Sequence, residues 1–221
     1  MSKILGVLGG MGPAATVAFL ARVQTLTPAQ GDADHIRVVM DMNPQVPDRN
    51  TRLGEAEVEL AAMALRLKAA GAEVLAMPCN TAHAQKAGIL AAGLPFIDMI
   101  ATTVAVVGGY DARSIGVLAT PGGEALYRAA LEAVGVRPVL LTGADREAFM
   151  ACVYGVKRGD TGPANRAEMA RLARALTTAG ADAIIAGCTE VPLLLDAGEV
   201  SVPFVDSAEV LAQACVDACL R

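Results

Sequence analysis

The stretch AGAEVLAMPC at residues 70–79 returns in the second half of the chain as AGADAIIAGC at residues 179–188. Both copies are apolar runs that end in a cysteine, and the two cysteines lie 109 residues apart. GVL at 6–8 and 116–118, and LPFID at 94–98 with VPFVD at 202–206, repeat in the same order at nearly the same offset. Similarity at one fixed period indicates internal duplication, so the sequence predicts two copies of a unit of about 110 residues.

Within each copy, short apolar runs alternate with longer segments of helical spacing. Strands are expected at 3–9, 36–42, 73–78, 95–98, 114–119, 137–141, 182–187 and 202–206. Helices are expected at 13–26, 54–70, 81–91, 99–108, 123–134, 145–157, 164–179, 190–196 and 207–220. Continuous apolar strands that alternate with helices are typical of a parallel sheet covered on both faces. The predicted class is α/β, with two pseudo-symmetric, flavodoxin- or Rossmann-like three-layer lobes facing across a cleft.

The duplication also predicts the domain boundaries. Residues 1–100 with 207–221 are expected to form the N-terminal lobe, which carries Cys79, and residues 101–206 the C-terminal lobe, which carries Cys188. The last segment, 207–220, is expected to pack back on the first lobe.

Composition excludes several classes of protein. Hydrophobic residues make up 54% of the 221 residues, which excludes disorder, while aromatics make up only 3%. Few aromatics and a net charge of −5 argue against nucleic-acid and anionic-membrane partners. The uncharged run 4–21 resembles a signal peptide, but GGMGP interrupts it, which favours a strand, a glycine turn and a helix. Five cysteines without metal-ligand spacing favour a reducing cytoplasm and no metal site.

Cys79 and Cys188 both follow predicted parallel strands at the sheet edge where ligands bind. Each precedes a predicted helix, whose N-terminus is expected to lower the pKa of the thiol. Facing lobes would place the two sulfurs about 7 Å apart, so that one thiolate removes a Cα proton and the other thiol protonates the opposite face. The other three cysteines, 152, 215 and 219, are expected to pack in helices.

Polar residues beside the two cysteines are candidates for binding an amino acid. Asn80, Thr81, Thr189 and Glu190 follow the thiols and are expected to hold an ammonium or carboxylate group, or else to cap the next helix. Thr120, at the end of the fifth predicted strand, is expected to complete the edge of the cleft.

Three further segments contribute candidates. GGMGP (9–13), which contains Met11, offers backbone N–H donors at a predicted strand-to-helix turn. Asn43 and Arg49 lie in MNPQVPDRN (42–50), where the arginine offers a fork for a carboxylate or a salt bridge to Asp48. Lys157 ends a helix in the second lobe, where a basic residue also complements the helix dipole.

The glycine loop leaves a second interpretation open. Gly10, Gly12 and Ala15 loosely fit the G-x-G-x-x-A dinucleotide fingerprint, and Asp41 ends the next predicted strand. Asp41 lies farther from the glycines than the usual ~20 residues, and a dinucleotide site leaves the repeated cysteines unexplained.

Six motifs resemble those of the cofactor-independent aspartate/glutamate racemase family: LGGMGPAAT, NPQVPDR, MPCNTAH, FIDM, IGVLAT and GCTEVPLLL, which run from residue 5 to 195. The resemblance implies that Cys79 and Cys188 are the catalytic acid/base pair and that Arg49, assisted by Lys157, holds the side-chain carboxylate of the substrate. Asn80, Thr81 and Thr189 would hold the ammonium and α-carboxylate end. It further implies two lobes, no pyridoxal phosphate or other cofactor, and a homodimer.

The sequence departs from the family pattern at Gly123, Glu124 and Ala125, where hydroxyl side chains are usual, and at Asn50, where threonine is common. The expected activity is interconversion of L- and D-aspartate, with glutamate or a broader range of amino acids open. The remaining alternatives are a dinucleotide-binding enzyme, a non-catalytic amino-acid-binding protein, and a related dicarboxylate isomerase or decarboxylase.

Overall fold

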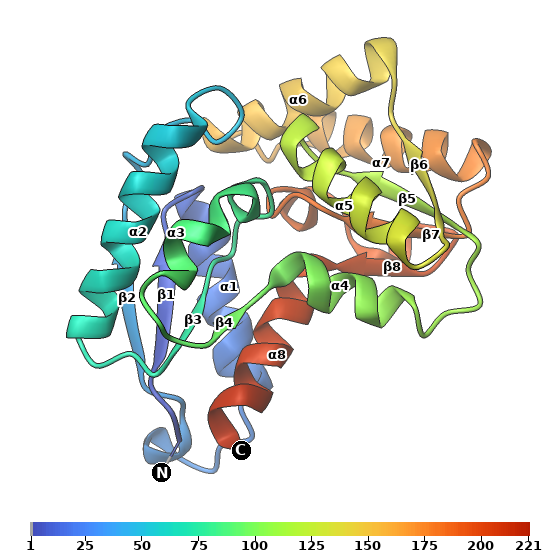
Figure 1. Cartoon of the computed structure of the whole chain (residues 1–221). Coiled ribbons are helices and arrows are strands. Elements are labelled where there is room, and N and C mark those ends of the chain that lie inside the picture. Colours follow the sequence, from blue (N-terminus) through green and yellow to red (C-terminus); the bar gives the residue numbers. More distant parts are fainter. Residues whose placement is uncertain (1) are drawn as a thin grey trace. The chain divides into compact units, whose positions relative to one another are not determined.

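The computed structural model describes residues 2–221, which contain eight strands and eight α-helices (Figure 1). The strands are β1 (Leu5–Gly9), β2 (Val38–Met42), β3 (Val74–Ala76), β4 (Phe96–Ile97), β5 (Ser114–Leu118), β6 (Arg137–Leu140), β7 (Ala183–Ala186) and β8 (Phe204–Asp206). The helices are α1 (Pro13–Leu26), α2 (Leu53–Ala69), α3 (Lys86–Leu90), α4 (Met99–Val107), α5 (Pro121–Ala133), α6 (Gly143–Lys157), α7 (Pro163–Thr178) and α8 (Ser207–Leu220). Four short 3-10 helices complete the order: η1 (Asp32–Asp34), η2 (Thr81–Gln85), η3 (Val191–Leu193) and η4 (Ala197–Glu199).

The strands form two four-stranded parallel sheets of identical topology. One sheet has the order β2-β1-β3-β4 and the other the order β6-β5-β7-β8. Position by position, β3 in the first sheet therefore corresponds to β7 in the second. This arrangement confirms the predicted α/β class with two similar parallel-sheet lobes.

The first compact unit contains the chain up to Thr102 and Ala208–Arg221. Its sheet is buried on both faces because alternate residues of each strand point to opposite sides. Leu8 and Leu75 pack with α2 and α3, whereas Leu5 and Val7 pack with α1 and α8. The C-terminal helix therefore closes one face of this unit, which has three layers.

The second unit contains Thr103–Ser207. Leu118, Ile184 and Ala186 pack into one cluster with the buried faces of α6 and α7. Helix α5 packs against β5 and β6 and buries Tyr127 and Leu131. No helix in residues 2–221 is long and apolar enough to cross a membrane.

One predicted element is wrong. The helix expected at 190–196 is only the single 3-10 turn η3. The apolar residues that suggested a helix, Val191, Leu194 and Leu195, are instead buried in the core of the second unit.

Candidate functional site

In the first unit, Cys79 lies in the turn after the carboxyl end of β3. Its side chain is 5% exposed and belongs to the core cluster between the sheet and α2. Asn80 and Thr81, which follow it, are also buried, and they open the 3-10 helix η2 rather than an α-helix. Asn80 occupies the cap position of η2 without a side-chain cap hydrogen bond. The predicted trio therefore sits together at the carboxyl edge of the first sheet.

The glycine loop after β1 is bonded internally. Thr16 Oγ1 accepts a hydrogen bond from the Gly10 N–H and donates one to the Gly12 carbonyl, each 3.0 Å long. Gly10 has a φ of +96°, and a Cβ there would lie 2.4 Å from the backbone of Asn43. Only glycine fits at this point, and it lets the loops after β1 and β2 lie against each other.

This loop gives the dinucleotide alternative no support. The Gly10 N–H that would face a phosphate is taken by Thr16, and α1 begins with Pro13, which has no N–H. Asp41, the candidate ribose ligand, is paired with Arg66 at 2.7 Å.

Arg49 reaches back to the glycine loop. Its guanidinium donates to the carbonyls of Val46, Pro47 and Met11 at 3.3, 3.4 and 3.4 Å, and its Nε is buried with no hydrogen-bond partner. The Met11 side chain itself is buried in the core. These bonds are long, so the fork of Arg49 keeps donor capacity for a carboxylate.

Asn43 is committed to the protein. Its amide nitrogen donates to Glu59 and its amide oxygen accepts from the Gln45 N–H, both at 2.9 Å. The amide therefore fixes the loop after β2, from which Arg49 projects.

In the second unit, Cys188 and Glu190 form a buried pair at the carboxyl edge of the second sheet. The Cys188 thiol donates to Glu190 Oε2 at 2.9 Å, and the two residues are 6% and 3% exposed. Thr189 Oγ1 lies 3.5 Å from the same oxygen, and Lys157 Nζ lies 4.0 Å from Oε1. Three predicted site residues, Cys188, Thr189 and Lys157, thus surround the carboxylate of a fourth, Glu190.

The expected pKa shift of Cys188 is wrong in sign. No α-helix begins behind this thiol, and burial, together with the charge of Glu190 and its hydrogen bond, raises the pKa of Cys188 well above its ordinary value. The positive charge of Lys157 opposes this rise in the pKa of Cys188 only weakly. The resting thiol of Cys188 therefore carries its proton at neutral pH.

Thr120 and Gly187 bring helix α5 onto the turn that holds Cys188. Thr120 caps α5 by accepting from the Gly123 N–H at 3.4 Å. A Cβ on Gly187 would lie 2.8 Å from the ring of the buried Tyr127, so the residue before Cys188 has to be small. The residue before Thr120, Ala119, also borders this turn, because a Cβ on Gly187 would lie 3.1 Å from the Cβ of Ala119.

All five cysteines are free and buried. Cys152 packs in the core of the second unit. Cys215 and Cys219 lie on α8 and pack in the cluster that this helix forms with the first sheet and α1, in line with the packing expected for all three. Burial raises the pKa of Cys215, Cys219 and Cys152. Among the described residues, no group of three or more histidine, cysteine and acidic side chains could hold a metal ion.

The sequence interpretation missed the contacts of two buried residues. His83 is buried and hydrogen-bonded to the Cys79 carbonyl, although its place four residues after Cys79 in MPCNTAH was a usable signal. Glu124 is buried and paired with Arg146 at 2.7 Å, and burial raises the pKa of its carboxyl. Arg146 lies 22 residues after Glu124, so no local sequence pattern indicates this ion pair.

The chain is similar to racemases over nearly its whole length. The model of the family described as Asp/Glu/hydantoin racemase matches residues 8–215. A broad specificity amino-acid racemase, RacX, of Bacillus subtilis is 27% identical over 96% of each chain. The structure of the Picrophilus torridus aspartate racemase superposes with a TM-score of 0.88 at 28% identity, covering 98% of this chain and 94% of that one. A glutamate racemase of Synechococcus is 32% identical over 54% of this chain and 44% of its own.

The family match covers both cysteines, the glycine loop after β1 and all the other predicted site residues. The chain belongs to the Asp/Glu/hydantoin racemase family and is, by homology, an amino-acid racemase.

Proposed function

We propose that this racemase interconverts the L- and D-forms of an acidic amino acid, with aspartate as the first candidate. The observation that carries the proposal is the equivalence of the two thiols. Cys79 and Cys188 follow the corresponding strands β3 and β7 of two sheets with identical order, and each is nearly fully buried. Inversion of a carbon centre needs one acid/base group for each face, and a duplicated fold supplies such a pair.

The reaction would proceed by two proton transfers at Cα. One cysteine, as the thiolate, removes the Cα proton and becomes a thiol. The other thiol delivers its proton to the opposite face and becomes a thiolate. Because resting Cys188 holds its proton beside Glu190, we assign it the acid step in the first turnover and Cys79 the base step. In the reverse direction the assignments exchange.

The carboxylates of the substrate need fixed donors, because removal of a weakly acidic Cα proton places negative charge on the α-carboxylate. We propose that Arg49, with the unpartnered Nε and long backbone bonds, binds the side-chain carboxylate. Asn80 and Thr81 beside one thiol, and Thr189 beside the other, would hold the α-carboxylate and ammonium. Lys157 would assist at the acidic end from beside Glu190.

Arg49 supports an acidic substrate, and the similarity to the Picrophilus aspartate racemase makes aspartate the first candidate among these. The added carboxylate of Glu124 does not oppose an acidic substrate as a bare charge, because Arg146 pairs with it. Because RacX is named as a broad specificity racemase, amino acids other than aspartate and glutamate also have to be tested as substrates.

The proposal is tested by incubating the protein, without added cofactor, with each enantiomer of aspartate, glutamate and a panel of neutral and basic amino acids. Chiral chromatography should detect the opposite enantiomer, fastest with aspartate. A faster reaction with glutamate or a neutral amino acid would overturn the choice of substrate. Absence of product with every amino acid would overturn the proposed activity.

We also expect a homodimer, on the family resemblance alone. Light scattering coupled to size-exclusion chromatography should give twice the chain mass of 22.6 kDa. A mass of one chain at all concentrations would contradict this expectation.

A further inference from the structure

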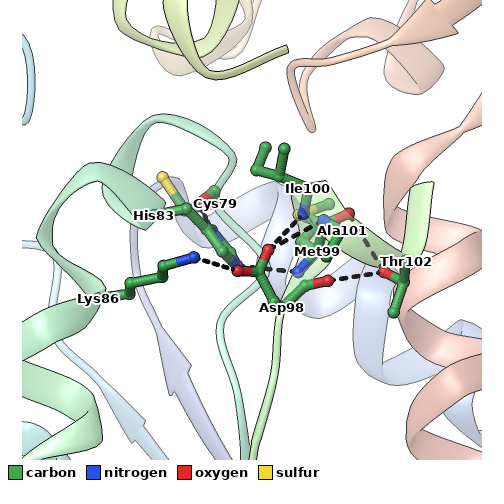
Figure 2. A network of polar contacts seen from close by, with 8 residues as sticks. All are labelled: Cys79, His83, Lys86, Asp98, Met99, Ile100, Ala101 and Thr102. Carbon is green, nitrogen blue, oxygen red and sulfur yellow. Dashed lines mark hydrogen bonds and ion pairs between the residues drawn. The ribbon is translucent and has the colours of Figure 1, made fainter. Parts of the chain in front are cut away.

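The residue that holds the Cys79 turn in place is His83, which is 2% exposed (Figure 2). Its Nδ1 lies 2.9 Å from the Cys79 carbonyl oxygen, and its Nε2 lies 3.0 Å from the backbone nitrogen of Met99, the first residue of α4. The ring also packs on Phe96, with 5.4 Å between centroids. One imidazole therefore links the turn after β3 to the start of the helix after β4.

These two partners fix the protonation of the ring. A carbonyl only accepts, so Nδ1 must carry the proton, and a backbone N–H only donates, so Nε2 must be bare. Burial lowers the pKa of His83, and the backbone contact at Cys79 and the charge of Asp98 oppose that shift. The ring is thus held neutral in one tautomer. Because both nitrogens are occupied by backbone, His83 cannot pass a proton to a substrate without losing a bond.

The far anchor of the ring is itself braced. Asp98 caps α4 by accepting from the N–H groups of Ile100 and Ala101 at 2.9 and 3.0 Å. Lys86, the first residue of α3, pairs with the same carboxylate at 2.7 Å. The Met99 amide that donates to His83 is therefore not part of a frayed helix end. Figure 2 shows the ring between this braced turn and Cys79.

We propose that His83 is a positioning residue that sets the place of the Cys79 thiol through the Cys79 carbonyl. This inference rests on the proposed function, in which Cys79 exchanges a proton with Cα. The Cys79 turn lies beyond the last β3 residue, Ala76, so the ladder of the sheet does not reach it. A proton transfer at carbon is sensitive to the position of the acid/base group, and a shift of about 1 Å costs roughly 100-fold in rate.

Two substitutions separate positioning from packing. His83→Phe keeps an aromatic ring beside Phe96 and removes both hydrogen bonds. His83→Gln keeps one donor and one acceptor at similar spacing, as the neutral imidazole has. His35→Gln removes the other histidine, and Val23→Ala destabilises the same unit in the cluster of α1 and α8, away from the Cys79 turn.

The first readout is kinetic. His83→Phe should lower kcat by roughly 100-fold, because the Cys79 thiol is displaced. KM should rise by a smaller factor, because Asn80 and Thr81 move with the Cys79 turn while Arg49 lies outside it. His83→Gln should recover most of that loss. Unchanged kcat in a folded His83→Phe protein would overturn the proposal, and so would a loss that His83→Gln shares fully.

The second readout does not need turnover. Alkylation by iodoacetamide, followed cysteine by cysteine with mass spectrometry, should be about tenfold faster at Cys79 in His83→Phe, relative to Cys215 in the same sample. Val23→Ala and His35→Gln should leave the ratio of Cys79 to Cys215 labelling unchanged. Equal acceleration at both cysteines in His83→Phe would show a general loss of stability and overturn the proposal. If the parent protein racemises no amino acid, the proposed function fails, and this ratio still decides whether His83 positions Cys79.

Discussion

Replacing Glu190 by glutamine tests how the structure holds the proton on Cys188. The thiol donates to the Glu190 carboxylate at 2.9 Å, and both side chains are buried. Loss of that proton would place a thiolate against a carboxylate. Glutamine keeps an acceptor for the thiol and adds an N–H that can donate to a thiolate, while it removes the negative charge.

The magnitude follows from the separation. Two unit charges 2.9 Å apart repel by about 6 kcal/mol at an effective dielectric constant of about 20. Lys157, 4.0 Å from the other carboxylate oxygen, and movement of the side chains offset part of this repulsion. If about one third remains, roughly 2 kcal/mol, Glu190→Gln should increase the thiolate population of Cys188 about 30-fold near neutral pH.

Because the thiolate is the reactive form, the rate of alkylation at Cys188 measures this population. Glu190→Gln should accelerate labelling of Cys188 about 30-fold relative to Cys152 in the same unit. An acceleration of about tenfold or more supports the reasoning. Glu147→Gln, which removes an exposed carboxylate from the same unit, is the matched control and should leave the ratio unchanged. An unchanged or lower Cys188 ratio in Glu190→Gln would refute the reasoning.

Three further predictions concern stability, each read by urea denaturation. Gly187→Ala places a Cβ 2.8 Å from the Tyr127 ring and should cost about 1–3 kcal/mol; a loss under about 0.5 kcal/mol would contradict the packing. Burial lowers the pKa of His83, so the unfolded histidine binds protons that the folded one resists, and stability falls as the pH drops below about 6.5. His83→Phe should flatten that dependence, and an equally steep slope would count against it. Burial raises the pKa of Glu124, so the protonated carboxyl stabilises the fold at low pH and this stabilisation is lost as the pH rises through the folded pKa. Between about pH 4 and pH 7, Glu124→Gln should therefore gain stability relative to the parent. A relative loss over that range would disprove the assignment.

Much of the fold could be predicted because parallel strands are buried on both faces and read as uninterrupted apolar runs. All eight strands lie within the predicted segments, and the repeat of AGAEVLAMPC as AGADAIIAGC correctly indicated two sheets of one topology. The helix expected at 190–196 failed because its apolar residues, Val191 and Leu194 among them, are buried by tertiary packing around a short turn. Apolar spacing alone does not distinguish these two causes.

The chemistry of the site was less accessible from the sequence. The cysteines and their neighbours could be found, because strand ends in a parallel sheet are where ligands bind. The raised pKa of Cys188 could not, since it depends on full burial and on which way the Glu190 carboxylate points. The contacts of His83 with Cys79 and Met99 likewise depend on two loops that meet only in the folded unit.

The central claim is that two cysteines exchange protons with one carbon from opposite faces. The most direct measurement is loss of the Cα–H signal of L- and D-aspartate in D₂O by NMR, with the parent protein, Cys79→Ser and Cys188→Ser. The account predicts that both enantiomers incorporate deuterium and racemise with the parent, and that each single substitution abolishes racemisation. Full racemisation by either variant would remove that cysteine from the mechanism and contradict the two-thiol account.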